Sequence, residues 1–369
     1  MANPNTLPLD SLILVTAANG LIASHVADQL LAAGYRVRGT VRDLAKCQWM
    51  TSLFDETYGP GKFELVRVST REEMTGPALW DDAMRGVSGV AHVLGAVDMT
   101  VRDVDASFAD EWPMHAAVLD AAKRCSHIRA FVFTSSAWAV YTPDASIRQT
   151  LTAASWNEEA LAVAAKARTK TTDPSQDNPK YMLAPYMALK TRLEQGFWQW
   201  VERERPAFAC NTVLLGTTMG QCLAPTGPQG VPSTAGMVRW VWDGTFRQVV
   251  DAMQPQWHVD AADAGRLYVA ALTQDDVRGE RVFGFGDRFS WFQVHKLLSE
   301  WYGDSMKIEG GIVPVAYLGV DQTDVPGRER GAELLGRLGR TGGWTGLEES
   351  LRANMKSIFE LEKALKEAD

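Results

Sequence analysis

Short apolar runs alternate with longer amphipathic stretches along the first 215 residues of the chain. The runs that predict strands are Ser11–Val15, Arg36–Val41, Phe63–Val68, Val87–Leu94, Arg129–Thr134 and Asn211–Leu215. The stretches that predict helices are Leu21–Ala33, Lys46–Tyr58, Leu79–Met84, Ser107–Lys123 and Pro185–Arg205. The fourth run is apolar almost throughout, which is typical of a strand buried on both faces. Strands that alternate with helices predict an α/β fold with a doubly wound parallel sheet.

The pattern is less regular in the second half of the chain. Ser146–Pro179 is a polar insertion with some helical character, and Gly216–Gly236 is rich in Gly, Pro, Ser and Thr, which predicts a loop or lid. Gly279–Phe285 is a candidate seventh strand, and Leu347–Lys366 predicts an amphipathic helix. A chain of 369 residues is long for one simple domain, so we expect a larger sheet domain with a smaller lid.

Composition and charge exclude several classes of protein. The chain is 46% hydrophobic and 22% charged, as globular enzymes are, and its net charge of −8 disfavours a nucleic-acid surface. No apolar run approaches the ~20 residues that span a bilayer, and residues 1–10 carry no signal-peptide pattern. We therefore expect a cytoplasmic protein with no membrane partner. The spacings of the Cys and His residues match no metal motif, so no metal is expected.

The turn after the first strand carries a candidate phosphate site. Ligands of such sheets bind at the carboxyl ends of the strands, and a dinucleotide turn normally has three glycines. Here Gly20 holds the middle place, with Ala17 and Ala23 at the outer two. Taken alone, Asn19–Gly20 predicts only a turn, but the flanking strand and helix favour nucleotide binding. The residues expected around the pyrophosphate are Thr16, Asn19, Gly20, Leu21 and Ile22.

The end of the second strand favours NADP(H) over NAD(H). An NAD site usually places an acid at this strand tip to bind the ribose diol, whereas here Arg42 follows and Lys46 lies four residues later. Arg42 can bind a 2′-phosphate and Lys46 can add a second charge, although Asp43 would weaken the site somewhat. The alternative interpretation is a solvated basic patch.

Three further residues are candidates for proton transfer. Tyr186 and Lys190 lie four apart on a predicted helix, and Ser136 follows the fifth strand. A nearby ammonium lowers the pKa of a phenol, so that Tyr186 can act as a general acid while Ser136 holds a carbonyl oxygen. The alternative is an exposed pair on the helix surface, worth a few tenths of a kcal/mol.

These residues together resemble the extended branch of the short-chain dehydrogenase/reductase superfamily, and within it the fungal NADPH-dependent aldehyde and ketone reductases related to dihydroflavonol reductase. The matching stretches are Val15–Gly20, Tyr35–Arg42, Gly89–Val93, Phe131–Ser136, Tyr186 with Lys190, Leu338–Arg340 and Leu347–Ser350. The resemblance implies hydride transfer from NADPH to a carbonyl, with Ser136, Tyr186 and Lys190 as the catalytic triad. It also implies a Rossmann-type cofactor domain over residues 1–215, with sheet segments returning at about 251–285. A substrate-binding lid would then comprise 216–250 and 286–369.

The chain departs from the family pattern at several cofactor positions. The loop after the fourth strand has Leu94-Gly95 where the family usually has Ala-Ser, and the loop after the sixth has Leu215-Gly216 in place of Pro-Asn. The acid that contacts adenine corresponds to Glu73, beside Met74. The further cofactor contacts that the resemblance implies are therefore Glu73, Met74, Leu94, Gly95, Leu215, Thr217 and Thr218.

The substrate is expected to be an apolar or aromatic carbonyl compound, since the chain has thirteen tryptophans. The departures from the family pattern leave open a specialised reaction, such as a biosynthetic step. The candidates to line its pocket are Trp138, Tyr181, Met219, Cys222 and Trp242, which are equally suited to a core. Two alternatives remain open. One is a non-redox protein on the same fold, such as a cofactor sensor, cyclase or lyase; the other is a sugar-nucleotide epimerase or dehydratase, which Arg42 disfavours. The expected assembly is a monomer or homodimer.

Overall fold

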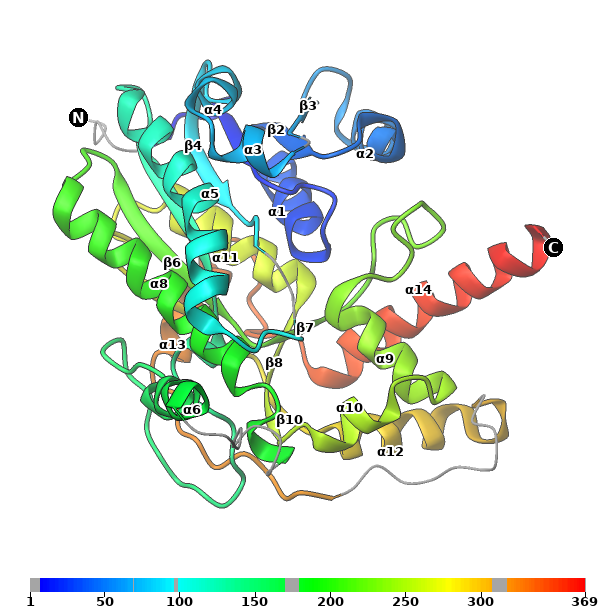
Figure 1. Cartoon of the computed structure of the whole chain (residues 1–369). Coiled ribbons are helices and arrows are strands. Elements are labelled where there is room, and N and C mark those ends of the chain that lie inside the picture. Colours follow the sequence, from blue (N-terminus) through cyan, green and yellow to red (C-terminus); the bar gives the residue numbers. More distant parts are fainter. Residues whose placement is uncertain (1–6, 69, 96–98, 170–178, 307–316, 369) are drawn as a thin grey trace.

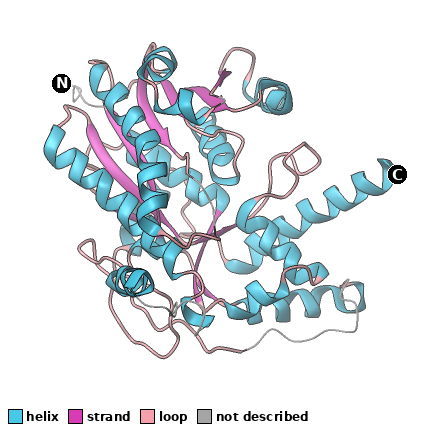
Figure 2. Ribbon diagram, in the orientation of Figure 1, coloured by secondary structure: helices cyan, strands magenta, loops and turns pink. Residues whose placement is uncertain are grey.

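A computed structural model describes residues 7–368, except 69, 96–98, 170–178 and 307–316. Its centre is a seven-stranded parallel sheet with the order β3-β2-β1-β4-β5-β6-β9 (Figures 1 and 2). The strands are β1 (Leu12–Val15), β2 (Arg36–Val41), β3 (Phe63–Arg67), β4 (Val87–His92), β5 (Ala130–Ser136), β6 (Ala209–Leu215) and β9 (Arg281–Gly284). The order reverses between β1 and β4, so the edge beside their carboxyl ends is where a ligand is expected.

Helices cover both faces of this sheet and bury separate apolar cores. On one face pack α1 (Leu21–Ala32), α2 (Leu44–Tyr58), α11 (Ala261–Thr273) and α13 (Arg328–Arg337). On the other face pack α3 (Arg71–Thr75), α4 (Pro77–Ala83), α5 (Val104–Arg124) and α8 (Ala184–Glu204). The expected doubly wound α/β fold is therefore confirmed.

A second, smaller layer lies beside the carboxyl edge of the sheet (Figure 1). Its three-stranded sheet has the order β10-β8-β7, formed by β7 (Thr217–Met219), β8 (Gln256–Asp260) and β10 (Arg288–Phe289). Its helices are α9 (Ser233–Asp243), α10 (Arg247–Ala252), α12 (Trp291–Tyr302) and α14 (Leu347–Ala368). The remaining elements are α6 (Glu158–Thr169) and the short turns η1 (Ala137–Ala139), η2 (Pro179–Tyr181) and η3 (Gly303–Ser305). In the described part of the chain, no helix is both long and apolar enough to cross a membrane.

The second half differs from the sequence-based expectation in detail. Residues 216–236, expected to be a loop, contain β7 and the start of α9. The helices α9, α10, α11, α12 and α13 have no counterpart among the predicted elements, and neither does α3 in the first half. Helix α13 packs on α11 and β9 of the large sheet, although its residues fall in the segment assigned to the lid. The predicted division at residues 215, 251 and 285 therefore stays a prediction.

Candidate active site

A cavity opens beside the carboxyl ends of the central strands. Loops after β4 and β6, the end of β5, and helices α1, α8 and α9 all contribute to its wall. The sequence-predicted residues that line it are Ile22, Leu94, Gly95, Ser136, Trp138, Tyr186, Lys190, Leu215, Thr217 and Thr218. Ten predicted residues from five separate segments thus converge on one space.

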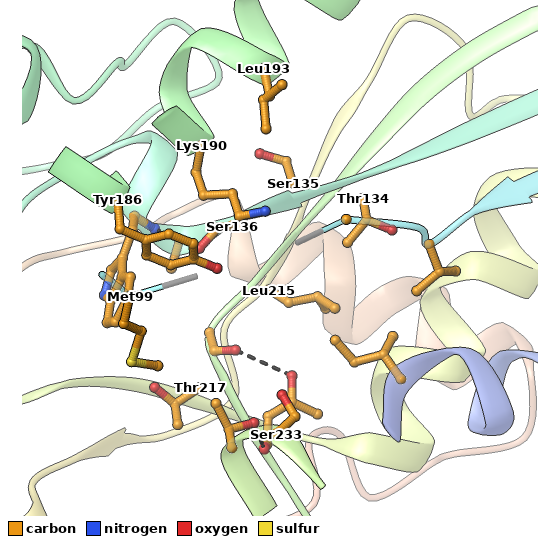
Figure 3. A pocket seen from close by; sticks show the side chains of 18 of the residues that line it. Met99, Thr134, Ser135, Ser136, Tyr186, Lys190, Leu193, Leu215, Thr217 and Ser233 are labelled. Carbon is orange, nitrogen blue, oxygen red and sulfur yellow. Dashed lines mark hydrogen bonds between the residues drawn. The ribbon is translucent and has the colours of Figure 1, made fainter. Parts of the chain in front are cut away.

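The three candidate catalytic residues face this cavity from two elements. Figure 3 shows the Tyr186 phenol and the Lys190 side chain extending from α8 toward the same open space, with Ser136 beside them. The Lys190 ammonium lies 5.3 Å from the centre of the Tyr186 ring. Trp138 packs perpendicular to Tyr186, with ring centres 5.9 Å apart. This packing fixes the direction of the phenol.

The Ser136 hydroxyl is oriented by its own backbone turn. Its Oγ accepts the Trp138 backbone N–H at 3.1 Å, at the start of η1. Because that bond occupies an oxygen lone pair, the hydroxyl proton remains to be donated into the cavity.

The turn between β1 and α1 keeps the backbone of a dinucleotide turn without its first glycine. Ala17 has a φ of 53°, in the left-handed region that favours glycine. Gly20 precedes α1, and no side chain caps the helix there, so its first amide groups have no side-chain acceptor. The dipole and amides of α1 are therefore suited to an anion.

Thr16 and Gly39 hold this turn against its neighbours. Thr16 Oγ1 accepts the backbone N–H groups of Val93 and Leu94, each at 2.9 Å. A Cβ built on Gly39 would lie 2.7 Å from the Cβ of Ala18, so the turn can pack on β2 only because residue 39 is glycine. Gly39 was not among the predicted site residues, although a glycine inside a strand often marks such a close approach.

We expect Ala17→Gly to stabilise the protein by about 1 kcal/mol, because glycine adopts a left-handed backbone without the steric cost of alanine. The midpoint of urea unfolding measures this effect. Ala23→Gly is the matched control, since Ala23 lies inside α1 and its replacement should be destabilising. A loss of stability in Ala17→Gly would contradict the strain that we assign to this turn.

The expected 2′-phosphate site lies at the end of β2. Arg42 and Lys46 are exposed, one directly after β2 and the other in the first turn of α2. Asp43 is the N-cap of α2, and its carboxylate accepts the Lys46 backbone N–H at 3.1 Å. Asp43, the acid expected to weaken the phosphate site, therefore has a structural role at the N-terminus of α2.

The two candidate adenine contacts are placed on the short helix α3. Glu73 is exposed, and its carboxylate accepts the Thr70 backbone N–H at 3.0 Å in a capping box. Met74 is buried in the core between α3 and α5. Neither residue lines the cavity described above.

Four of the five candidate substrate contacts lie elsewhere in the structure. Tyr181 donates its hydroxyl to Glu159 at 2.9 Å, whereas Met219, Cys222 and Trp242 are buried core residues. Burial raises the pKa of the Cys222 thiol to about 12, which suits a core thiol. The wall that the sequence analysis missed comes chiefly from Met99, Leu193, Ser233, Thr234, Met237, Met253 and Gln256. Most of these belong to the second layer, in which the pattern predicted α14 but not α9, α10 or α12.

Across the residues that the structure describes, no group of three His, Cys, Asp or Glu side chains is arranged to hold a metal ion.

Comparison with known proteins places the chain in a family. The model of the NAD dependent epimerase/dehydratase family matches residues 13–215. The chain is 32% identical over 348 residues to aldehyde reductase 2 of Sporidiobolus salmonicolor, which covers 94% of this chain and 95% of that protein. It is 33% identical over 358 residues to ketoreductase adrE of Penicillium rubens, with 96% and 98% covered.

Among solved structures, the chain is similar to Gre2 of Candida albicans in complex with NADPH. The TM-score is 0.74 at 19% identity, over 96% of this chain and 99% of that one. This likeness supports the fold, and the sequence matches support the family. The chain belongs to the NAD dependent epimerase/dehydratase family, the extended short-chain dehydrogenase/reductases, as the sequence motifs predicted.

Proposed function

We propose that this protein uses NADPH to reduce the carbonyl group of a ketone or aldehyde to an alcohol. The observation that carries the proposal is the convergence of Ser136, Tyr186 and Lys190 on one cavity at the point where the strand order reverses. The relatives named above as an aldehyde reductase and a ketoreductase support the same reaction class.

The residues around the cavity fit a nicotinamide dinucleotide phosphate. The first amides of α1 have no side-chain cap and suit the pyrophosphate. The exposed Arg42 and Lys46 suit the 2′-phosphate, and Asp43 is engaged at the N-terminus of α2. Leu215 and Thr217 lie across the cavity from α8 (Figure 3), and with Thr218, which also lines the cavity, they would hold the nicotinamide end. When bound, the reduced nicotinamide supplies a hydride to the carbonyl carbon.

Side chains of the protein supply the proton that the carbonyl oxygen receives. Ser136 donates its hydroxyl to the carbonyl oxygen and polarises it. Tyr186 transfers its phenolic proton to the same oxygen as negative charge develops there, so the product is an alcohol. The Lys190 ammonium stabilises the phenolate that Tyr186 becomes. One hydride and one proton are added, and the oxidised nucleotide is the second product.

The cavity wall favours an apolar or aromatic substrate, in line with a biosynthetic role. Three methionines (Met99, Met237 and Met253) line it with Trp138. Methionine side chains adapt their shape and make favourable contacts with rings. The amide of Gln256 is engaged, since it accepts the Trp138 indole N–H at 2.9 Å. The wall thus offers mainly apolar contact to the part of the substrate beyond the carbonyl.

Calorimetry of NADPH and NADH binding, with Arg42→Ala alongside, tests the cofactor assignment. We expect NADPH to bind at least about 10-fold more tightly than NADH, because Arg42 can make charge-assisted hydrogen bonds to the 2′-phosphate. Arg42→Ala should weaken NADPH binding by about 10- to 100-fold and leave NADH binding nearly unchanged. Arg36→Ala is the matched control, since Arg36 lies at the opposite end of β2.

Other outcomes of this measurement identify the alternatives. Protein that purifies with bound NAD would favour an epimerase or dehydratase. Failure to bind either nucleotide would contradict the proposal and favour a non-redox protein. The left-handed Ala17 in the turn would then be the first residue to test as the cause of the lost binding.

A further inference from the structure

A chain of buried polar side chains runs behind the candidate active site, from the end of β1 to α5. Thr16 Oγ1 lies 3.2 Å from His92 Nδ1, and His92 Nε2 lies 2.8 Å from His115 Nδ1. His115 Nε2 in turn lies 3.3 Å from Glu111 Oε1. All four residues are at most 3% exposed. Nothing in the proposed reaction yet uses this chain.

The hydrogen bonds in the chain have a single direction. Thr16 Oγ1 already accepts the backbone N–H groups of Val93 and Leu94, so its own proton must go to His92 Nδ1. His92 then carries its proton on Nε2 and donates it to His115 Nδ1, which leaves His115 to donate from Nε2 to Glu111.

Both rings are neutral, as this arrangement requires. Burial, together with the neighbouring His115, holds the pKa of His92 well below its usual range. Burial likewise lowers the pKa of His115, and the Glu111 carboxylate offsets this only in part. Each ring therefore has one N–H donor and one acceptor nitrogen, and the chain ends on an acceptor oxygen of Glu111.

The Glu111 carboxylate and the Lys190 ammonium both lie close to Gly95. A Cβ built on Gly95 would lie 3.5 Å from Lys190 Nζ and 3.7 Å from Glu111 Oε1. The distance from Lys190 Nζ to Glu111 Oε1 is therefore at most the sum of those two distances. His115, Gly95 and Lys190 also line the cavity that Tyr186 faces. At this range the carboxylate attracts the ammonium.

We propose that Glu111, held by the Thr16–His92–His115 chain, is a positioning residue that keeps the Lys190 ammonium directed at Tyr186. The inference rests on the proposed carbonyl reduction and deepens it. It also links the turn expected to hold the pyrophosphate to the residue that tunes the phenol, since Thr16 begins the chain.

Further charged groups of the described residues lie near α5. Those on the elements packed against α5 form pairs on its outer side, where solvent screens them. The pairs are Arg71 with Asp110, Arg124 with Asp81, Lys123 with Glu204, and Arg192 with Asp105. Among the residues that the structure describes, His115 binds the Glu111 carboxylate in the interior, and the Lys190 ammonium lies beside Gly95.

The pH profile of carbonyl reduction tests the role of Glu111. Reduction requires the protonated phenol of Tyr186, so kcat falls as pH rises through its deprotonation. Glu111→Gln removes a nearby negative charge, which makes the phenol lose its proton at lower pH. We expect the high-pH limit of activity to move down by about one pH unit. His115→Leu should move it in the same direction, because Glu111 loses its donor.

His115→Gln is the rescue variant, since an amide can accept from His92 and donate to Glu111, and it should restore a profile close to that of the unaltered protein. Glu204→Gln, on the surface of α8, is the matched control. A Glu111→Gln protein whose rate falls equally at every pH, with an unmoved limit, would overturn the inference and indicate a structural role.

An ultraviolet difference titration of the Tyr186 phenol, against Tyr186→Phe proteins, gives a second readout that needs no turnover. We expect the phenol to ionise at lower pH in Glu111→Gln, and an unchanged titration would overturn the inference. If the unaltered protein reduces no carbonyl compound, the proposed function fails, and this titration still decides the role of Glu111.

Discussion

Replacing Tyr186 with Phe is expected to lower kcat for carbonyl reduction by about 100- to 10,000-fold, the range that a general acid usually contributes. The change removes only the phenolic oxygen. The ring keeps its perpendicular contact with Trp138, whose centre lies 5.9 Å away, so the fold and the cavity wall should persist. Steady-state kinetics with NADPH and a panel of aromatic and aliphatic ketones and aldehydes measures the effect.

Two further results make the Tyr186 experiment decisive. NADPH affinity should change little in Tyr186→Phe, because the loss acts on the chemical step. Tyr58→Phe is the matched control, since the Tyr58 hydroxyl donates to Asp28 at 2.7 Å on the outer side of α1 and α2. Carbonyl reduction that survives Tyr186→Phe within about 10-fold would contradict the assignment of Tyr186 as the general acid.

The sequence predicts the large sheet well, for a physical reason. Strands buried on both faces must be apolar almost throughout, and the helices between them show one apolar stripe each. The predicted strands Arg36–Val41 and Phe63–Val68 therefore match β2 and β3 to within a residue. The convergence of Ser136, Tyr186 and Lys190 also follows from sequence, because their positions at a strand end and on the next long helix fix where they meet.

The second layer was harder to predict, because its residues serve two environments at once. Helix α9 buries Met237 and Val238 in the core, yet Ser233, Thr234 and Met237 also line the cavity. A helix that faces both a core and a substrate does not show a simple polar and apolar division. The strand β7 was not predicted because its three residues lie within the Gly- and Pro-rich stretch before α9, whose composition is typical of a loop.

The buried polar groups are invisible in sequence because their partners are distant along the chain. Thr16, His92 and His115 have no common motif, and only the fold joins them. In the same way, the steric need for Gly39 depends on the approach of Ala18 from another element. Patterns along one segment reveal its secondary structure and its motifs, whereas contacts between segments require the tertiary structure.

Helix α8 carries a third residue on the face of Tyr186 and Lys190. Glu194 lies four residues beyond Lys190 and is fully buried. Its carboxylate binds Arg281 of β9 through two hydrogen bonds of 2.8 Å each. It also accepts the hydroxyl of Ser135 at 2.7 Å, next to Ser136, and that of Thr212 at 2.9 Å. Glu194 therefore joins the helix of the phenol to the strand of the serine.

Glu194→Gln is expected to lower the free energy of unfolding by about 3–5 kcal/mol, because it leaves the Arg281 guanidinium buried without a counter-charge. Only 6% of the Arg281 side chain is exposed, so water cannot replace the carboxylate. The midpoint of urea unfolding measures the loss. Arg330→Gln is a matched control, because Arg330 pairs with Asp276 and Glu280 where solvent reaches all three side chains, and should cost much less.

A double variant separates the charge from the anchoring role of Glu194. In Glu194→Gln with Arg281→Met, no uncompensated charge remains. The amide oxygen can accept from one of the hydroxyls of Ser135 and Thr212 while the amide NH2 donates to the other, so stability should largely recover. If stability recovers while kcat is lower than in the unaltered protein, the ion pair also sets the distance between Ser136 and Tyr186. If Glu194→Gln alone costs less than about 1 kcal/mol, the pair contributes no more than a surface ion pair does, and the anchoring of α8 must come from its apolar face.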